Sequence, residues 1–237
     1  NDAGVAQATS TIFISSTGSI GIGTAAPASR LDITNSATSS AVITLRDPLG
    51  NVSFELRAGT STLFNTFVGV SAGAVNTTGT NNTANGYQAL LSNTTGSQNT
   101  AIGGIALFQN TTGSNNTAIG IGTLATNSTG SFNIAIGDAA LNFNTTGFGN
   151  TASGENALTL NSTGNFNSAF GYQAGVNVTT GYDNIFLGHD ANAGGNAITT
   201  GFNNIGLGYN IKFPSTSTNN MLNIGNFLFA NLPATTT

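Results

Sequence analysis

NTAIGGIALFQNTTGSN (residues 99–115) is followed without a gap by NTAIGIGTLATNSTGSF (116–132) and NIAIGDAALNFNTTGFG (133–149). The glycine of NTAIG, here called the anchor glycine, recurs every 17 residues from Gly69 to Gly188, then after 20 at Gly208 and after 17 at Gly225. The three extra residues are predicted within 191–197. A short fixed period indicates one small unit stacked many times, each unit burying its apolar face against its neighbours. At about 3.3 Å per residue, such a unit holds two or three short strands, so the sequence predicts an all-β fold, a β-solenoid (parallel β-roll) of about ten 17-residue coils.

Residues at equal places in successive coils form columns. The residue before each anchor glycine is mostly apolar, which predicts a core column containing Val68, Asn85, Ile102, Ile119, Ile136, Ser153, Phe170, Leu187, Leu207 and Ile224. Four residues after the anchor, a second apolar column is predicted at Leu90, Leu107, Leu124, Leu141 and Leu158, followed by Gly175 and Asn192.

Four residues before the anchor, an unbroken asparagine column is predicted to hydrogen-bond as a ladder along the axis. Its members are Asn82, Asn99, Asn116, Asn133, Asn150, Asn167, Asn184 and Asn204. A second glycine column contains Gly79, Gly96, Gly113, Gly130, Gly147, Gly164, Gly181 and Gly201. Both glycine columns are predicted to occupy turns with positive φ, which other residues resist.

The composition excludes several function classes. Only 5% of the 237 residues are charged and the net charge is −4, so there is no basic stripe for nucleic acid. No apolar run reaches the 18 or more residues that span a membrane. The chain has no cysteine, hence no disulfide. Its start at Asn1 instead of Met fits a processed or excised form. The expected location is extracellular or at the cell surface.

The ends of the chain differ from the repeat. Short strands are predicted at 11–15, 18–23 and 29–34, and a β-hairpin at 41–46 and 52–57, because turn residues separate runs of alternating apolar residues. The run 221–232, MLNIGNFLFANL, is predicted to be one apolar terminal strand. These limits suggest three regions, an N-terminal strand module (1–60), the solenoid (61–212) and a C-terminal strand (213–237).

Three segments carry a resemblance to known families. The units at 99–107 and 116–124 resemble the head repeats of trimeric autotransporter adhesins. The segment GSIGIGTAAPASRLDI (18–33) resembles a module of phage tail fibres and repetitive bacterial surface proteins. The run MLNIGNFLFANL is similar to a strand that precedes that module in such proteins. The resemblance implies left-handed parallel β-rolls that form trimers and bind surface glycans.

The order of these segments predicts self-association. Segments that are neighbours in the fibre families lie at opposite ends of this chain, and joining the end of one copy to the start of the next rebuilds the module. We therefore expect head-to-tail polymerisation, in which a terminal strand completes the sheet of the neighbouring copy. The candidate assembly residues are Thr11, Ile12, Phe13, Ile14, Phe227, Leu228, Phe229 and Leu232.

Glycosylation is the strongest chemical signal. N-x-S/T sequons occur at Asn51, Asn76, Asn81, Asn93, Asn110, Asn115, Asn127, Asn144, Asn161 and Asn177. Six of them are 17 residues apart and form one column. Sugars on that column would hydrate a surface with little charge, but N-T-T-G turns create the sequon by themselves, so turn chemistry explains the pattern equally well.

Catalytic, metal and cofactor sites have little support. His189 beside Asp190 belongs to an outward, variable column, and Asp138 and Glu155 supply too few oxygens for calcium. Neither a metal nor a cofactor is expected, and we expect no enzyme.

The preferred function is a structural fibre subunit whose partner is itself. The alternative is an adhesin head or tail-fibre segment whose aromatic residues bind glycans (Tyr87, Phe132, Phe148, Phe166, Tyr172, Tyr182). Ice binding by the threonine column at Thr83, Thr100, Thr117 and Thr151 is a third hypothesis, although Ile134 and Ile185 interrupt it.

Overall fold

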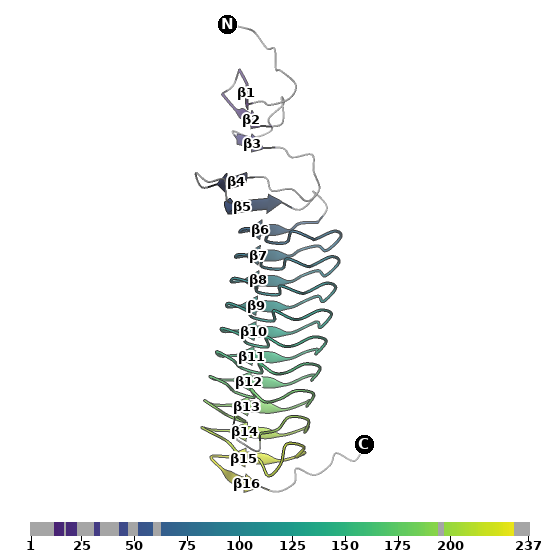
Figure 1. Ribbon diagram of the computed structural model, residues 1–237, viewed down its shortest axis with the longest axis vertical. Coiled ribbons are helices and arrows are strands. Elements are labelled where there is room, and N and C mark those ends of the chain that lie inside the picture. The colour runs from purple at the N-terminus through teal and green to yellow at the C-terminus, as the bar shows by residue number, and fades with distance from the viewer. Residues whose placement is uncertain are drawn as a thin grey trace.

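The structure is a computed structural model that describes residues 12–16, 18–22, 31–33, 43–46, 52–58, 63–193 and 197–229. The described part of the chain is all-β and forms a long rod (Figure 1). Its strands are β1 (Ile12–Ile14), β2 (Ile20–Ile22), β3 (Leu31–Ile33), β4 (Ile43–Arg46), β5 (Val52–Ala58), β6 (Thr66–Val68), β7 (Thr83–Asn85), β8 (Thr100–Ile102), β9 (Thr117–Ile119), β10 (Ile134–Ile136), β11 (Thr151–Ser153), β12 (Ser168–Phe170), β13 (Ile185–Leu187), β14 (Ile205–Leu207), β15 (Leu222–Ile224) and β16 (Phe227–Phe229).

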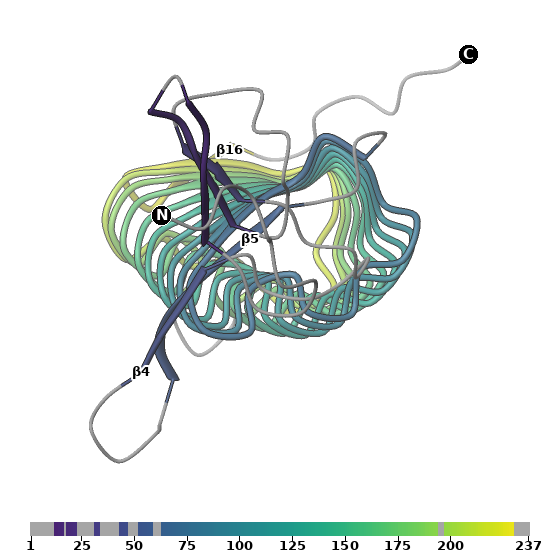
Figure 2. The same ribbon diagram turned by 90° about the horizontal axis from the view of Figure 1, so that it is seen from above.

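Strands β6–β15 form the predicted solenoid. They pair in parallel and in chain order. Paired residues are one repeat apart in the sequence, as in Ala101 opposite Ala118. Between β13 and β14 the offset becomes 20 residues, with Ile185 opposite Ile205, yet the strands stay in register. Seen along the stack, successive coils lie almost over one another and rotate slightly (Figure 2). The β-solenoid and its 17-residue repeat are confirmed.

Hydrogen bonds join the coils on every side, beyond the three-residue strands. The backbone N–H of Leu107 donates to the carbonyl of Thr123 at 3.0 Å, that of Thr111 to Ser128 at 2.9 Å, and that of Asn115 to Ser97 at 2.9 Å. Because turns as well as strands are bonded to the next coil, each coil has few backbone groups left unpaired. The result is a stack held together around its whole circumference.

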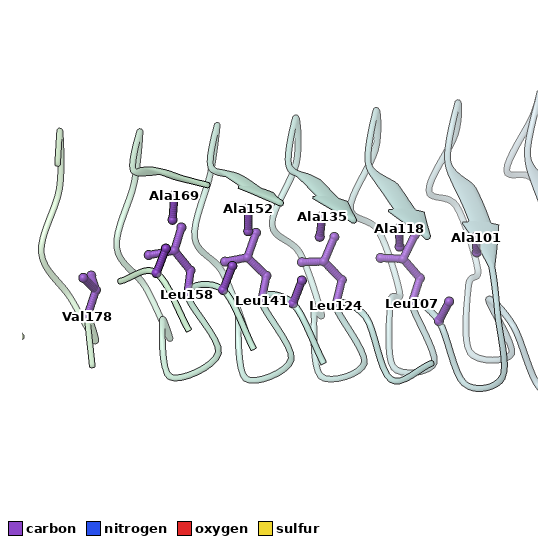
Figure 3. Packing of buried hydrophobic residues seen from close by; sticks show 14 of the residues in the cluster. Ala101, Leu107, Ala118, Leu124, Ala135, Leu141, Ala152, Leu158, Ala169 and Val178 are labelled. Atoms are coloured by element: carbon purple, nitrogen blue, oxygen red, sulfur yellow. The ribbon is translucent and has the colours of Figure 1, made fainter. Parts of the chain in front are cut away.

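The interior is lined by alanine and leucine. The leucine column is confirmed, since Leu90, Leu107, Leu124, Leu141 and Leu158 are all fully buried. The predicted column before the anchor glycine is wrong: Ile102, Ile119 and Ile136 are 37–42% exposed, and the alanine at the centre of each of these three strands is buried instead. Side chains alternate along a strand, so only the central residue of three points inward. Figure 3 shows these alanines facing the leucines.

Two positions show why the inward-facing residue at the centre of a strand is usually small. Phe186 replaces the alanine in β13, and Gly175 replaces the leucine that it would meet; a Cβ at Gly175 would lie 2.9 Å from the Phe186 ring. Phe67 in β6 is matched in the same way by Gly73, where a Cβ would lie 2.5 Å from that ring. At both positions, a large side chain from the strand is therefore matched by a glycine in the place of the leucine.

Along most of the rod, both glycine columns lack room for a side chain, but only the anchor column has a positive φ. The anchor Gly120 has φ +135°, a conformation that residues with a side chain avoid, as predicted. Gly113, in the second column, has no such φ. A Cβ there would lie 2.3 Å from the carbonyl oxygen of Gly130 and 2.4 Å from Oδ1 of Asn110, so lack of space requires this glycine. The prediction of positive φ is wrong for the second column.

Strands outside the solenoid extend or flank it. The predicted hairpin is confirmed as β4 and β5, and β5 pairs antiparallel with β6, which continues the main sheet. Strands β1, β2 and β3 form a separate three-stranded sheet at the end of the rod opposite β16 (Figure 1). The run MLNIGNFLF makes two strands, because the chain turns at Gly225 and Asn226 and β16 returns antiparallel to β15. The prediction of one strand was wrong there, and the suggested division into three regions stays a prediction.

Candidate functional site

The asparagine column four residues before the anchor is a buried ladder, as predicted. The backbone N–H of Asn133 donates to Oδ1 of Asn116 at 3.0 Å, and the Nδ2 of Asn133 donates to the Gly147 carbonyl at 2.8 Å and to the same Oδ1 at 3.2 Å. The same arrangement recurs in its neighbours and continues from Asn184 to Asn204 across the three-residue insertion. Its role is structural.

The sequon column forms a second ladder that the sequence did not predict. Asn93, Asn110, Asn127, Asn144 and Asn161 are fully buried. In each coil the Nδ2 makes two hydrogen bonds: that of Asn127 donates to Oδ1 of Asn110 at 2.7 Å and to the Gly130 carbonyl at 2.9 Å. An asparagine amide has two hydrogens, so both are used.

This geometry leaves no place for a glycan on those five residues. An N-linked sugar replaces one Nδ2 hydrogen and is bulky, so it would break a ladder bond and expand the closely packed interior. For this column, the structure favours turn chemistry over glycosylation. The ladder ends at Asn161, whose Oδ1 is buried without a partner because Val178 stands where the next asparagine would be.

The other sequons lie elsewhere. Asn81 is exposed and Asn115 is half-buried, so both remain candidates for glycosylation. Asn76 is half-buried and starts the second ladder by accepting a bond from Nδ2 of Asn93 at 2.7 Å. Asn177 is half-buried, and its Nδ2 donates to the Ala193 carbonyl at 3.2 Å. Asn51 lies outside the described residues.

Ionisable side chains do not gather. In the described ranges, no three His, Cys, Asp or Glu residues lie together as metal ligands would. Nδ1 of His189 lies 3.1 Å from Oδ2 of Asp190, and the histidine side chain is 55% exposed. Its ring stacks on Tyr172, with centroids 4.9 Å apart, and lies 5.4 Å from Tyr209. The pair is therefore part of an aromatic stack on the surface.

A second aromatic row lies just before the strands. Centroids of Phe132 and Phe148 are 5.2 Å apart, those of Phe148 and Phe166 5.4 Å, and those of Tyr182 and Phe202 4.8 Å. The phenylalanines before β10, β11 and β12 are between 38% and 55% exposed. These rings contact one another from coil to coil.

The candidate assembly strands lie at opposite ends of the rod (Figure 1). At one end, Ile12 pairs with Ile22 and Ile14 with Ile20, and the four side chains are between 37% and 67% exposed. At the other end, Phe227 is 76% exposed and β16 is the last strand of the main sheet among the described residues. The backbones of Phe13, Leu228 and Phe229 belong to these strands, whereas Thr11 and Leu232 lie outside the described part.

The outer side of the main sheet is a surface that the sequence analysis missed. It consists of the first and third residues of β6–β15, here called the outer columns, which contain isoleucine, leucine and phenylalanine beside threonine and serine. The sequence contained a signal for this surface. In a three-residue strand the two outer residues point to one side and the central residue to the other, so a small central alanine indicates that the larger flanking residues face outward. Thr83, Thr100, Thr117 and Thr151 belong to the first outer column.

Comparisons of the chain with family models, with curated proteins and with solved structures give no match. No helix in the described residues is long and apolar enough to cross a membrane.

Proposed function

We propose that this chain is a non-enzymatic structural subunit of an extracellular fibre and that it assembles head to tail through its terminal strands. One observation carries the proposal: apolar strands with exposed side chains, Ile12 and Ile14 in β1 and Phe227 in β16, lie at opposite ends of a rod. Two different surfaces at opposite ends make a heterologous contact, which propagates into a filament when it does not close into a ring.

The small size of the N-terminal sheet supports the same joint. It has three strands of three residues each, the shortest usual strand length, and a sheet this small needs an apolar face packed against another element to be stable. Strand β16 has a free edge among the described residues, and apolar edge strands recruit partners. Addition of β16 to the next copy's β1–β3 sheet would cover apolar side chains of both ends.

A pair of complementary variants tests the joint. Ile12→Asp with Ile14→Asp disables one end, and Phe227→Asp disables the other. Neither variant alone should form filaments, but a mixture retains one intact joint and should give discrete particles of twice the mass of either variant alone, by electron microscopy and analytical ultracentrifugation. Val75→Asp, at a site 49% exposed, is the control that should polymerise like the wild type. Filaments from either end variant alone would contradict the proposal.

The second candidate is an adhesin head or tail-fibre segment that binds surface glycans. The exposed stack of Tyr172, His189 and Tyr209 favours it, because aromatic faces accept the apolar faces of sugars. Discrete trimers, with glycan binding that is lost in Tyr172→Ala with Tyr209→Ala, would support this function. Glycosylation of the fibre is proposed only for Asn81 and Asn115.

A further inference from the structure

The outer columns of β6–β15 expose a row of large apolar side chains along the described rod. Their exposed large apolar members are each 37–52% accessible: Ile102, Ile119, Ile134, Ile136, Phe170, Ile185, Leu187 and Ile224. The surface continues on one side into Phe132, Phe148 and Phe166, and on the other into Ile121, Tyr172 and Tyr209. Monomeric proteins rarely expose contiguous apolar patches above a few hundred Å².

We infer that the outer columns pair with the same columns of a second copy, so that two rods lie side by side. The end joint plays no part in this contact, which stands whether or not the chain polymerises axially. Two such faces would pack as the sheets of a β-sandwich do, about 10 Å apart with interdigitated side chains.

The size of the surface suits a stable pair. Ten strands at about 4.8 Å give a length of ~48 Å, and three strand residues with one flanking residue on each side give a width of ~16 Å. The product is roughly 800 Å² per partner, the size typical of a specific protein interface. A flat partner of the same length and spacing is needed, and another copy of this sheet supplies both.

The chemistry of the surface also favours a second copy. The outer columns contain no Asp, Glu, Lys or Arg, so pairing the surface with itself places no like charges together. The described sheet has one such face, and a single face that meets its own copy forms an isologous, two-fold contact. Rings of three need two different faces on each copy.

The distribution of large residues sets the orientation. In the first two strands of the solenoid, β6 and β7, the outer columns contain Thr66, Thr83 and Asn85. In the later strands they contain the isoleucines, Phe170 and Leu187. Parallel rods place strand against equal strand, so large apolar residues meet each other. Antiparallel rods would set the polar start of one stack against the apolar end of the other. We therefore expect parallel pairs, which leave corresponding ends side by side.

Paired substitutions in the Phe227→Asp background test the contact without axial growth. Ile136→Asp with Leu187→Asp places charges on the outer columns, at sites 42% and 52% exposed. Leu160→Asp with Phe143→Asp, at sites 42% and 51% exposed, is the matched control away from them. Circular dichroism should show that both double variants are folded, because all four sites are solvent-accessible.

Sedimentation equilibrium gives the result. The background and control proteins should have twice the 23.7 kDa chain mass, and the outer-column variant should be a monomer with dissociation at least ~100-fold easier, since a desolvated charge without a partner opposes pairing. A monomeric background protein, a trimer, or a pair that persists in the outer-column variant would overturn the inference. If Phe227→Asp still polymerises, the end joint is wrong, and the number of chains across each filament tests the lateral contact separately.

Discussion

Residues 82–164 and residues 165–229 use the same coil but fill it differently. In the first region, each coil encloses the alanine of its strand, a second small residue (alanine, or threonine at Thr123), a leucine, and two asparagines that bond to the asparagines of the adjacent coils. In the second region, Val178 and Ile198 take the place of one asparagine ladder, and Phe186, Ile211 and Phe213 enlarge the apolar interior. The other ladder continues through both.

The position of the three-residue insertion shows what each ladder contributes. The insertion lies between Asn184 and Asn204, where the first ladder still bonds across 20 residues at 2.9 Å and 3.0 Å, and where the second ladder has already ended. Ladder bonds demand equal geometry in successive coils, whereas apolar contacts are not directional. One ladder is enough to hold the register, and the absence of the other gives room for an irregular coil.

The largest effect is expected from crowding the regular coils. In Gly113→Ala, the new Cβ meets backbone of the next coil at 2.3 Å, so the free energy of unfolding should fall by about 4 kcal/mol or more. Gly104→Ala is the control, because a Cβ there meets nothing within 4 Å and the backbone needs no positive φ. Urea denaturation should show Gly104→Ala unchanged or slightly more stable. Equal losses in both would contradict the role of space.

The exchange of large and small residues in the second region is expected to be coupled. Phe186→Ala leaves a cavity and should cost roughly 3–5 kcal/mol. Gly175→Leu alone should also destabilise, because its Cβ would meet Leu158 at 2.8 Å and Phe186 at 2.9 Å. The double variant restores the alanine and leucine of the first region and should be more stable than the sum of the single changes by about 2 kcal/mol. Additive losses in denaturation would show that the two sites do not share one space.

A substitution in the middle of the second asparagine ladder should lower the free energy of unfolding more than one at its end. Asn127→Val removes two donated bonds and the bond that Oδ1 accepts from Asn144 at 2.9 Å, a loss of roughly 2–4 kcal/mol. Asn161→Val removes two donated bonds and also the unpaired Oδ1, so its loss should be smaller by about 1 kcal/mol. Thermal or urea unfolding measures both, and a costlier Asn161→Val would refute the ladder account.

The smallest effect is expected when the protein is expressed in a host that glycosylates sequons, because the buried asparagines should stay unmodified. Peptide mass spectrometry of the folded protein should find Asn93, Asn110, Asn127, Asn144 and Asn161 unmodified, because their Nδ2 hydrogens are buried and bonded. Asn81 and Asn115 are the internal comparison, since their side chains reach solvent. Sugar on Asn127 of the folded protein would contradict the described coil.

Much of the fold followed from spacing, because a column of equal residues identifies what must be stacked. The repeat, the leucine column and the first asparagine ladder were all predictable from Gly69 to Gly225. The inward side of each strand was mispredicted, since Ile119 is larger than Ala118 and hydrophobic size alone chose the wrong residue. Only the narrow interior, in which Leu107 and Ala118 fit together, decides which of them is buried.

The candidate site was less predictable. A sequon is both a glycosylation signal and an N-T-T-G turn, and only the hydrogen bonds of Asn127 separate the two. The terminal strands were predictable from their apolar composition, but the turn at Gly225 and Asn226 was not, because a glycine at an anchor position predicts another coil. The outer columns became visible only once the strand faces were known.

Cryo-electron microscopy of the assemblies that this protein forms tests the central proposal most directly, namely that the terminal strands join rods head to tail. The account predicts axial continuity, with β16 of one copy adding as a strand to the β1–β3 sheet of the next at about 4.8 Å. Filaments whose rods meet without strand pairing at their ends, or isolated trimeric rods with no axial contact, would contradict it.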